Sequence, residues 1–316
     1  MPFDETIESP ALLLRSGLKY MWFKNLLVYR LNAWSATSDT LEEKLSQHIL
    51  QSCSGLDMQS RGWVSPKTDG EPLVHTLGSQ MLIALGMEKK LLPASVINQF
   101  AKSRAAEIEE QQGYKPGRKQ MKEIKESITD ELLPRAFAIR SKTCAWIDPD
   151  NQLLVIDAAN LGRADELVEM LIKSVDGISF SLIKTNTRAS SAMTSWLAGE
   201  DFPGGFTIDR DCELRGTGDE RATVRYVRHA LEVDEINKHI KSGKEVTKLA
   251  MTWNDKLSFV LHENLQLKRL TPLDILKDQA DVSDLDDVFD TDFAMMTGEL
   301  KKLLPDLVEA LGGERR

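Results

Sequence analysis

Residues 91–137 read LLPASVINQFAKSRAAEIEEQQGYKPGRKQMKEIKESITDELLPRAF and predict two amphipathic helices joined by a turn. Pro93 suits the start of a helix, and Pro134 ends the second helix because a residue before proline disfavours helical geometry. Two glycines and a proline in residues 113–117 interrupt the pattern. The apolar residues that recur at helical spacing are Ile97, Phe100, Ala101 and Ile108 before the turn, and Met121, Ile124, Ile128 and Leu132 after it.

The turn and the start of the second helix are strongly basic. Residues 115–125 carry one acidic residue, Glu123, against five basic ones, Lys115, Arg118, Lys119, Lys122 and Lys125. Two helices of this length would project roughly 25–30 Å from the rest of the protein. A long hairpin with a positive tip favours a polyanionic target, although an ordinary solvated helix pair would have the same pattern.

The composition is that of an ordinary globular protein. The 316 residues are 41% hydrophobic and 28% charged, and no apolar run is long enough to span a bilayer. The first twenty residues lack the basic start and apolar run of a secretory signal. Cys53, Cys144 and Cys212 are scattered, which predicts buried, reduced thiols in the cytoplasm.

The net charge of −9 is concentrated in one region. Residues 274–299 contain nine acidic residues and one lysine, a charge of −8, so the remainder of the chain sums to −1. Basic residues can therefore dominate local patches, and the net charge does not exclude nucleic-acid binding.

The order of predicted elements indicates an α+β fold with mixed, largely antiparallel sheets. Hairpins outnumber regular strand–helix–strand units, and the last third ends in a three-stranded meander. The predicted strands are residues 22–31, 80–85, 143–148, 152–157, 178–183, 206–208, 223–230, 245–253, 257–261 and 265–270. The predicted helices outside the hairpin are residues 39–49, 162–173, 190–197, 234–240 and 298–311, while residues 52–72 are rich in Gly, Ser and Pro.

Signatures of enzymes are mostly missing from the sequence. There is no phosphate-binding loop motif, no metal-ligand spacing among the histidines, and no nucleophile motif around a serine. The acidic stretch is the one candidate, because clustered carboxylates can hold Mg²⁺ as in a nuclease. Its members are Asp284, Asp286, Asp287, Asp290 and Asp292; they lack the EF-hand pattern, and such runs also occur as solvated loops.

Basic residues cluster again in the last third of the chain, from Arg215 onward. Strict alternation along residues 244–253 would place Lys244, Val246 and Lys248 on one face of a strand. Cations on one face suit phosphate contacts, which need charge but no base code. The candidate DNA-binding residues here are Arg225, Arg228, His229, Lys244, Lys248, Lys268 and Arg269. No helix-turn-helix, zinc finger or aromatic RNA-binding pattern is present, so binding should be independent of sequence.

Several segments together resemble the RdgC family of bacterial recombination-associated proteins. They are MWFKNLLVYRL from Met21, GWVSP (62–66), KKLLPASVI (89–97), ELLPRAF (131–137), AWID (145–148), HIKSGKEVTKLAMTW (239–253), LKRL (267–270), FDTDFAMMTGEL (289–300) and ALGGE (310–314). The resemblance covers the chain except residues 1–20, which form an extension outside the family pattern.

The resemblance implies a cytoplasmic, nucleoid-associated protein with no enzymatic activity, cofactor, metal or membrane partner. It implies a homodimer closed into a ring that encircles duplex DNA, binds double- and single-stranded DNA without sequence preference, and restrains RecA-dependent recombination, including at replication forks. The body would then comprise residues 21–92 and 141–316, and residues 93–140 would form a helical-hairpin tip.

The resemblance also assigns roles to individual residues. Phe137 would anchor a dimer contact together with Leu133 and Pro134, and Arg135 would face DNA beside it. Arg228, His229 and Lys244 match a second functional cluster, although a lysine and a glutamine are expected at positions 228 and 229. The turn residues Lys115, Arg118 and Lys119 depart from the lysine-dense family version. Two other functions remain open, namely a protein-interaction scaffold that binds no DNA and a Mg²⁺-dependent nuclease.

Overall fold

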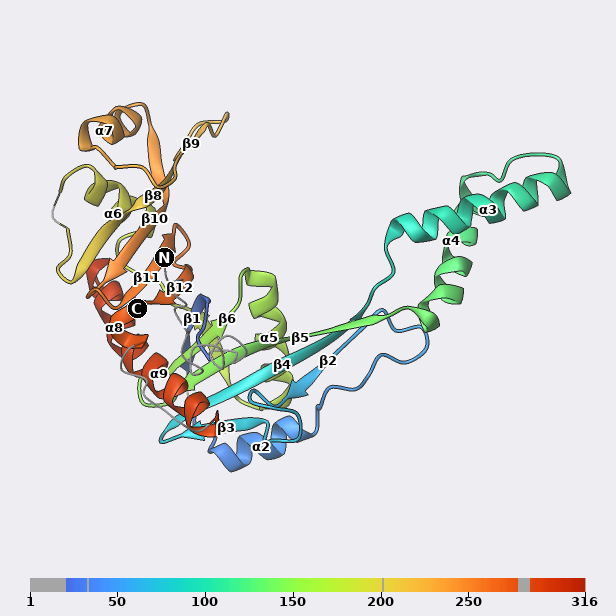
Figure 1. Cartoon of the computed structure of the whole chain (residues 1–316), viewed down its shortest axis with the longest axis horizontal. Coiled ribbons are helices and arrows are strands. Elements are labelled where there is room, and N and C mark those ends of the chain that lie inside the picture. The colour runs from blue at the N-terminus through green and yellow to red at the C-terminus, as the bar shows by residue number, and fades with distance from the viewer. Residues whose placement is uncertain (1–20, 33, 201, 278–284, 316) are drawn as a thin grey trace, which may run out of the picture. The chain divides into compact units, whose positions relative to one another are not determined.

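The computed structural model describes residues 21–32, 34–200, 202–277 and 285–315, and the side chains of residues 277 and 285–287 are not described. The chain divides into two compact units, whose elements are labelled in Figure 1. Unit 1 contains the described residues of Met1–Arg30, Leu153–Leu161 and Phe180–Arg316. Unit 2 contains Leu31–Gln152 and Gly162–Ser179. The predicted α+β class is confirmed.

Unit 2 contains an antiparallel sheet around a long central strand. β4 (Gln80–Lys90) pairs with β5 (Ala138–Asp148) from Met81 to Lys90, and β2 (Gln59–Val64) and β3 (Val74–Leu77) pair with β4. α2 (Ser38–Ser46) and α5 (Leu161–Ser174) supply buried leucines to this unit. Trp146 is fully buried.

The strand β2 lies within residues 52–72, where no strand was predicted. Gly62 within this strand is required by a close backbone approach. A Cβ placed there would lie 2.3 Å from the backbone nitrogen of Leu50, because residues 48–50 bond to Trp63 alongside the strand. Glycine within a strand often marks such an approach rather than a turn.

The predicted helical pair is present between β4 and β5. α3 (Ala94–Gln112) begins after Pro93 and ends at Gly113, which has a φ of 79°. α4 (Arg118–Leu132) is followed by the 3₁₀ turn η1 (Leu133–Arg135), as expected at Pro134. Ala101, Ala105, Ile124 and Ile128 form the buried seam between the helices. Phe100 lies outside this seam and is 50% exposed, which corrects its predicted place in the apolar stripe.

Unit 1 contains the larger antiparallel sheet. Its strands follow the order β6 (Leu153–Asp157), β1 (Asn25–Asn32), β12 (Leu267–Pro272), β11 (Leu257–His262), β10 (Lys244–Trp253), β8 (Phe206–Gly216) and β9 (Thr223–Tyr226). β7 (Ser179–Leu182) pairs with β1. The predicted three-stranded meander is confirmed as β10, β11 and β12. β8 is far longer than the predicted strand.

Helices cover this sheet in unit 1. α6 (Ala189–Leu197), α7 (Val233–Lys241) and the short α8 (Asp274–Lys277) lie against it, and α9 (Leu285–Ala310) contributes a row of buried side chains from Phe293 to Leu307. The Trp253 indole donates a hydrogen bond to Asp306 at 2.9 Å, which ties α9 to β10. α9 begins within the acidic stretch and not at residue 298 as predicted.

The three cysteines are free thiols, but only Cys212 is buried, so the prediction of burial fails for Cys53 and Cys144. No helix in the described part of the chain is long and apolar enough to cross a membrane.

Candidate nucleic-acid interface

Glu213 organises the charged residues on one face of the unit 1 sheet. Its side chain is almost fully buried, and its carboxylate accepts from Arg225 at 2.6 Å, Lys248 at 2.9 Å and Arg215 at 3.0 Å. The Thr247 hydroxyl donates to the same carboxylate at 3.0 Å. β9 and β10 bring these cations to Glu213 because Arg225 and Lys248 are its direct cross-strand neighbours. One carboxylate therefore holds three cations in place.

The pKa of Glu213 reflects two opposing effects. Burial by itself would raise the pKa of this carboxyl group, but hydrogen bonds from Lys248, Arg225 and Thr247 outweigh it and lower the pKa to about 2. Glu213 is therefore ionised at any physiological pH, and its cations stay fixed.

A second carboxylate, Asp211, supports two arginines with unusual backbone geometry. Arg228 and Arg269 have φ angles of 52° and 55°, in the left-handed region that non-glycine residues rarely adopt. Asp211 accepts the backbone N–H of Arg228 at 2.8 Å and lies 3.5 Å from the Arg269 guanidinium. Strain of this kind is often found at functional sites.

Together these residues form what we call the basic face: Arg215, Arg225, Lys248, Lys268 and Arg269, with Asp211, Glu213, Glu263 and His262 between them. Lys268 forms no ion pair with the described residues. His262 is held neutral, because burial and the neighbouring Lys268 and Lys248 lower its pKa to about 4. Five cations against three carboxylates leave two positive charges in excess, which suits contact with a polyanion.

Lys244 does not share the face of Lys248, so that prediction was wrong. A β-bulge lies between Val246 and Lys248, where the pairing to β8 shifts by one residue. The extra residue, Thr247, therefore reverses the alternation beyond it, and Val246 is fully buried. Lys244 lies at the start of β10, where its ammonium group donates to Ser242 at 2.8 Å.

His229 lies beside Arg228 after β9. It is exposed, and its ring stacks at a tilt on Tyr226 with 5.7 Å between centroids. The Nδ1 atom of His229 lies 2.7 Å from the Ala230 carbonyl oxygen, which leaves Nε2 to face a ligand, and Arg228 is also exposed.

The basic residues of the hairpin turn belong to unit 2. Lys115, Arg118 and Lys119 are exposed and form no ion pair with described residues. Lys122, one turn further along α4, pairs with Glu126 at 3.6 Å, and both side chains are largely exposed. Exposed pairs of this kind contribute little to stability, so they leave the cations available.

An exposed apolar patch surrounds Phe137 in unit 2. Phe137 is 85% exposed, and its carbonyl accepts the N–H of Leu91 at 2.7 Å. Ile139 on β5 and Leu91 are each about half exposed. Pro134 and Arg135 are also exposed, whereas Leu133 is only 2% exposed and belongs to the core of the unit. Leu133 can therefore support this surface but offers almost none of it.

Comparison with known proteins identifies the family. The model of the RdgC family, described as "Putative exonuclease, RdgC", matches residues 21–314. The chain belongs to the RdgC family. Residues 1–20 lie outside the match, as expected from the sequence.

Several relatives called "Recombination-associated protein RdgC" are similar over nearly their whole length. The protein of Janthinobacterium sp. (strain Marseille) is 56% identical over 93% of this chain and 99% of its own. Those of Herminiimonas arsenicoxydans and Cupriavidus necator are 55% and 54% identical, over 99% and 100% of their own lengths.

The acidic stretch, the nuclease candidate in this RdgC-family chain, falls partly outside the described residues. Asp284 lies outside them, and the side chains of Asp286 and Asp287 are not described. Asp292 is 2% exposed and accepts the backbone N–H of Met21 at 3.2 Å. Among the described residues, no group of three acidic, histidine or cysteine side chains could hold a metal ion.

Sequence reasoning missed the two carboxylates that organise the basic face of this RdgC-family chain. A signal was present: Asp211, Glu213 and Arg215 alternate along β8, which places charges of opposite sign on one face of a strand. The pattern was overlooked because the predicted strand ended at residue 208.

Proposed function

We propose that this chain is a sequence-nonspecific DNA-binding protein that restrains RecA-dependent recombination. The observation that carries the proposal is the basic face, where the buried Glu213 and the half-buried Asp211 fix cations and an excess of positive charge remains, in a chain of the RdgC family. Fixed cations without base-reading groups suit phosphate contacts, which carry affinity but no sequence information. Double-stranded and single-stranded DNA would both bind.

The protein acts as a homodimeric ring around duplex DNA in this proposal. The patch at Phe137 supports a dimer contact there, because an exposed aromatic anchor among apolar neighbours is typical of interface hot spots. Pro134 completes this contact and Arg135 faces DNA beside it. A closed ring leaves DNA only by opening an interface or by sliding off an end. Phosphate neutralisation alone can then be weak enough to allow sliding.

The remaining cations extend the DNA contact. Lys115, Arg118 and Lys119 serve at the tip of a projecting hairpin, and Arg228, His229 and Lys244 serve beside the basic face. A duplex enclosed in this way is a poor substrate for a recombinase filament, which gives the restraint of RecA a physical basis. The protein would act in the cytoplasm, associated with the nucleoid.

A second candidate is an exonuclease, which the description of the family model favours. Asp286 and Asp287 are its proposed Mg²⁺ ligands, since clustered carboxylates suit that ion. This candidate predicts that Mg²⁺ converts bound DNA to fragments and that Asp286→Asn with Asp287→Asn abolishes cleavage while binding persists. Intact DNA after prolonged incubation with Mg²⁺ would refute it.

The deciding experiment is fluorescence anisotropy with a labelled duplex of random sequence across a salt series. We expect log affinity to fall linearly with log salt concentration and to be equal for unrelated sequences. Lys268→Ala should reduce the slope by about one unit, because Lys268 is a cation without an ion pair on the basic face. Absence of binding even at low salt would overturn the proposal and favour a protein-interaction scaffold.

A further inference from the structure

An apolar cavity of about 510 Å³ lies in unit 1, lined by residues that are not part of the basic face except for Glu263. Buried leucines of α9, among them Leu304 and Leu307, form its floor together with Leu27 of β1. Leu182 of β7 is 42% exposed and forms an apolar edge. A concave apolar surface of this size is typical of ligand sites.

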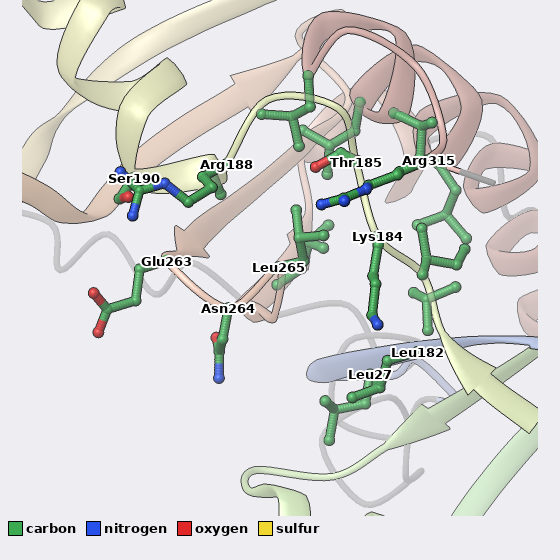
Figure 2. Close-up of a pocket in the computed structure, with 18 residues that line it drawn as sticks. Leu27, Leu182, Lys184, Thr185, Arg188, Ser190, Glu263, Asn264, Leu265 and Arg315 are labelled. Carbon is green, nitrogen blue, oxygen red and sulfur yellow. The ribbon is translucent and has the colours of Figure 1, made fainter.

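One wall of the cavity is a leucine in a strained conformation. Leu265 has a φ of 62° in the turn between β11 and β12, where the Leu265 N–H donates to the His262 carbonyl at 3.0 Å. Glycine is favoured at such a position, because a branched side chain in this region is an outlier. Figure 2 shows the Leu265 side chain at the middle of the cavity residues. The strained backbone conformation therefore places the Leu265 side chain in the wall of the cavity.

Two cations, Lys184 and Arg315, lie at the mouth of the cavity. Lys184 and Arg315 are exposed and form no ion pair with the described residues, and Figure 2 shows both side chains beside Thr185 and Leu265. The other charged groups at the mouth are already paired: Arg188 with Glu245 at 3.8 Å, and Glu263 with Arg215 at 3.2 Å. A ligand with negative charge next to apolar groups would complement this arrangement.

We propose that this cavity binds a short, extended peptide segment of a partner protein, in which apolar side chains follow carboxylates. The apolar side chains would lie over the leucine floor against Leu265, and the carboxylates would meet Lys184 and Arg315. Polar groups on the wall favour a peptide over an acyl chain. The Asn264 side-chain N–H groups can donate to a peptide carbonyl, and the Thr185 hydroxyl, which donates to the Thr187 carbonyl at 2.7 Å, can still accept from a peptide N–H. The turn that carries Leu265 also carries Glu263, so a bound partner would lie next to the basic face.

The test is isothermal titration calorimetry of the full chain with unlabelled hexapeptides. The probe is acetyl-Glu-Asp-Asp-Leu-Ile-Leu. One comparison peptide has lysines in place of the acidic residues, and another keeps the acidic residues but has serines in place of the apolar ones. The serine peptide controls for simple attraction to the basic face. We expect the probe to bind at least tenfold more tightly than either comparison peptide.

Two variants locate the binding site. Leu265→Gly removes the leucine side chain and relieves the backbone strain, so the variant should fold normally. It should lower the affinity for the probe peptide about tenfold, the amount expected for the loss of one leucine contact. Its matched control is Asp255→Gly, which relieves the same kind of strain at a φ of 53° in the turn at the other end of β11. The control should leave probe binding unchanged.

The double variant Lys184→Glu with Arg315→Glu tests the charge and keeps the proposal testable if Leu265→Gly fails to fold. It should reverse the preference, so that the lysine peptide binds more tightly than the probe. The proposal is overturned if no peptide binds or if the serine peptide binds as well as the probe. It is also overturned if decanoate, which represents an acyl chain with a carboxylate, binds as tightly as the probe. Binding that both variants leave unchanged would place the peptide elsewhere and also overturn it.

Discussion

The substitution Glu213→Gln tests how the basic face is held together. Glutamine matches the protonated glutamic acid in shape, so the variant reports what the negative charge contributes. The pKa of this carboxyl group falls from 4.5 to about 2 on folding. Each pKa unit corresponds to about 1.4 kcal/mol, so the charge stabilises the fold by roughly 3 kcal/mol at neutral pH.

The sign of this effect determines its pH dependence. Because the pKa of Glu213 is lowered in the folded state, its contribution is complete above about pH 4.5 and is lost as the pH falls through about 2. At pH 3 the linkage relation predicts that a little under half of this contribution to the free energy of unfolding remains. The difference in stability between wild type and Glu213→Gln should therefore shrink to about half between pH 7 and pH 3.

The assay is urea unfolding followed by circular dichroism at both pH values. Glu263→Gln is the matched control. Glu263 contacts Arg215, which also contacts Glu213, but the Glu263 side chain is 45% exposed. An exposed pair is worth under about 1 kcal/mol, so the control should change stability little. A loss under about 1 kcal/mol for Glu213→Gln at pH 7, or a loss that does not vary with pH, would refute the reasoning.

Three further predictions concern other parts of the chain. Phe137→Ala should raise the dissociation constant of the proposed dimer at least tenfold in sedimentation experiments, as expected for an aromatic anchor, while Phe100→Ala, on α3, should not. Equal effects of the two substitutions would place the contact elsewhere. Lys244→Ala should lower DNA affinity and reduce the salt slope by about one unit in the anisotropy assay, and an unaltered slope would remove Lys244 from the site. Burial raises the pKa of the Cys212 thiol to about 12, so iodoacetamide at pH 8 should modify Cys212 only on unfolding, after the half-buried Cys53 and Cys144. Rapid modification of Cys212 in the native protein would contradict its burial.

Elements with a regular apolar period were predictable from the sequence. The stripe of Ala101, Ile124 and Ile128 predicted the helical pair, because residues three or four apart share one face of a helix. The meander of β10, β11 and β12 followed from short alternating runs between turn residues. The family segments, which are local strings of residues, likewise predicted the RdgC match.

The errors arose where distant parts of the chain meet. No strand was predicted around Gly62, whose missing side chain allows the backbone near Leu50 to approach β2. The bulge at Thr247 separates Lys244 from Lys248, and a bulge depends on how β10 pairs with β8 rather than on either strand alone. Phe100 has the spacing of a core residue, yet the second helix does not cover it.

The sequence by itself determined which residues carry charge. Only the tertiary structure decided which charges converge, because Arg225 and Lys248 come from strands on either side of Glu213. An ion pair depends on distance and burial, and neither quantity is encoded in local spacing. The candidate basic residues were therefore visible in the sequence, while the role of Glu213 and Asp211 in fixing them became evident only in the folded sheet.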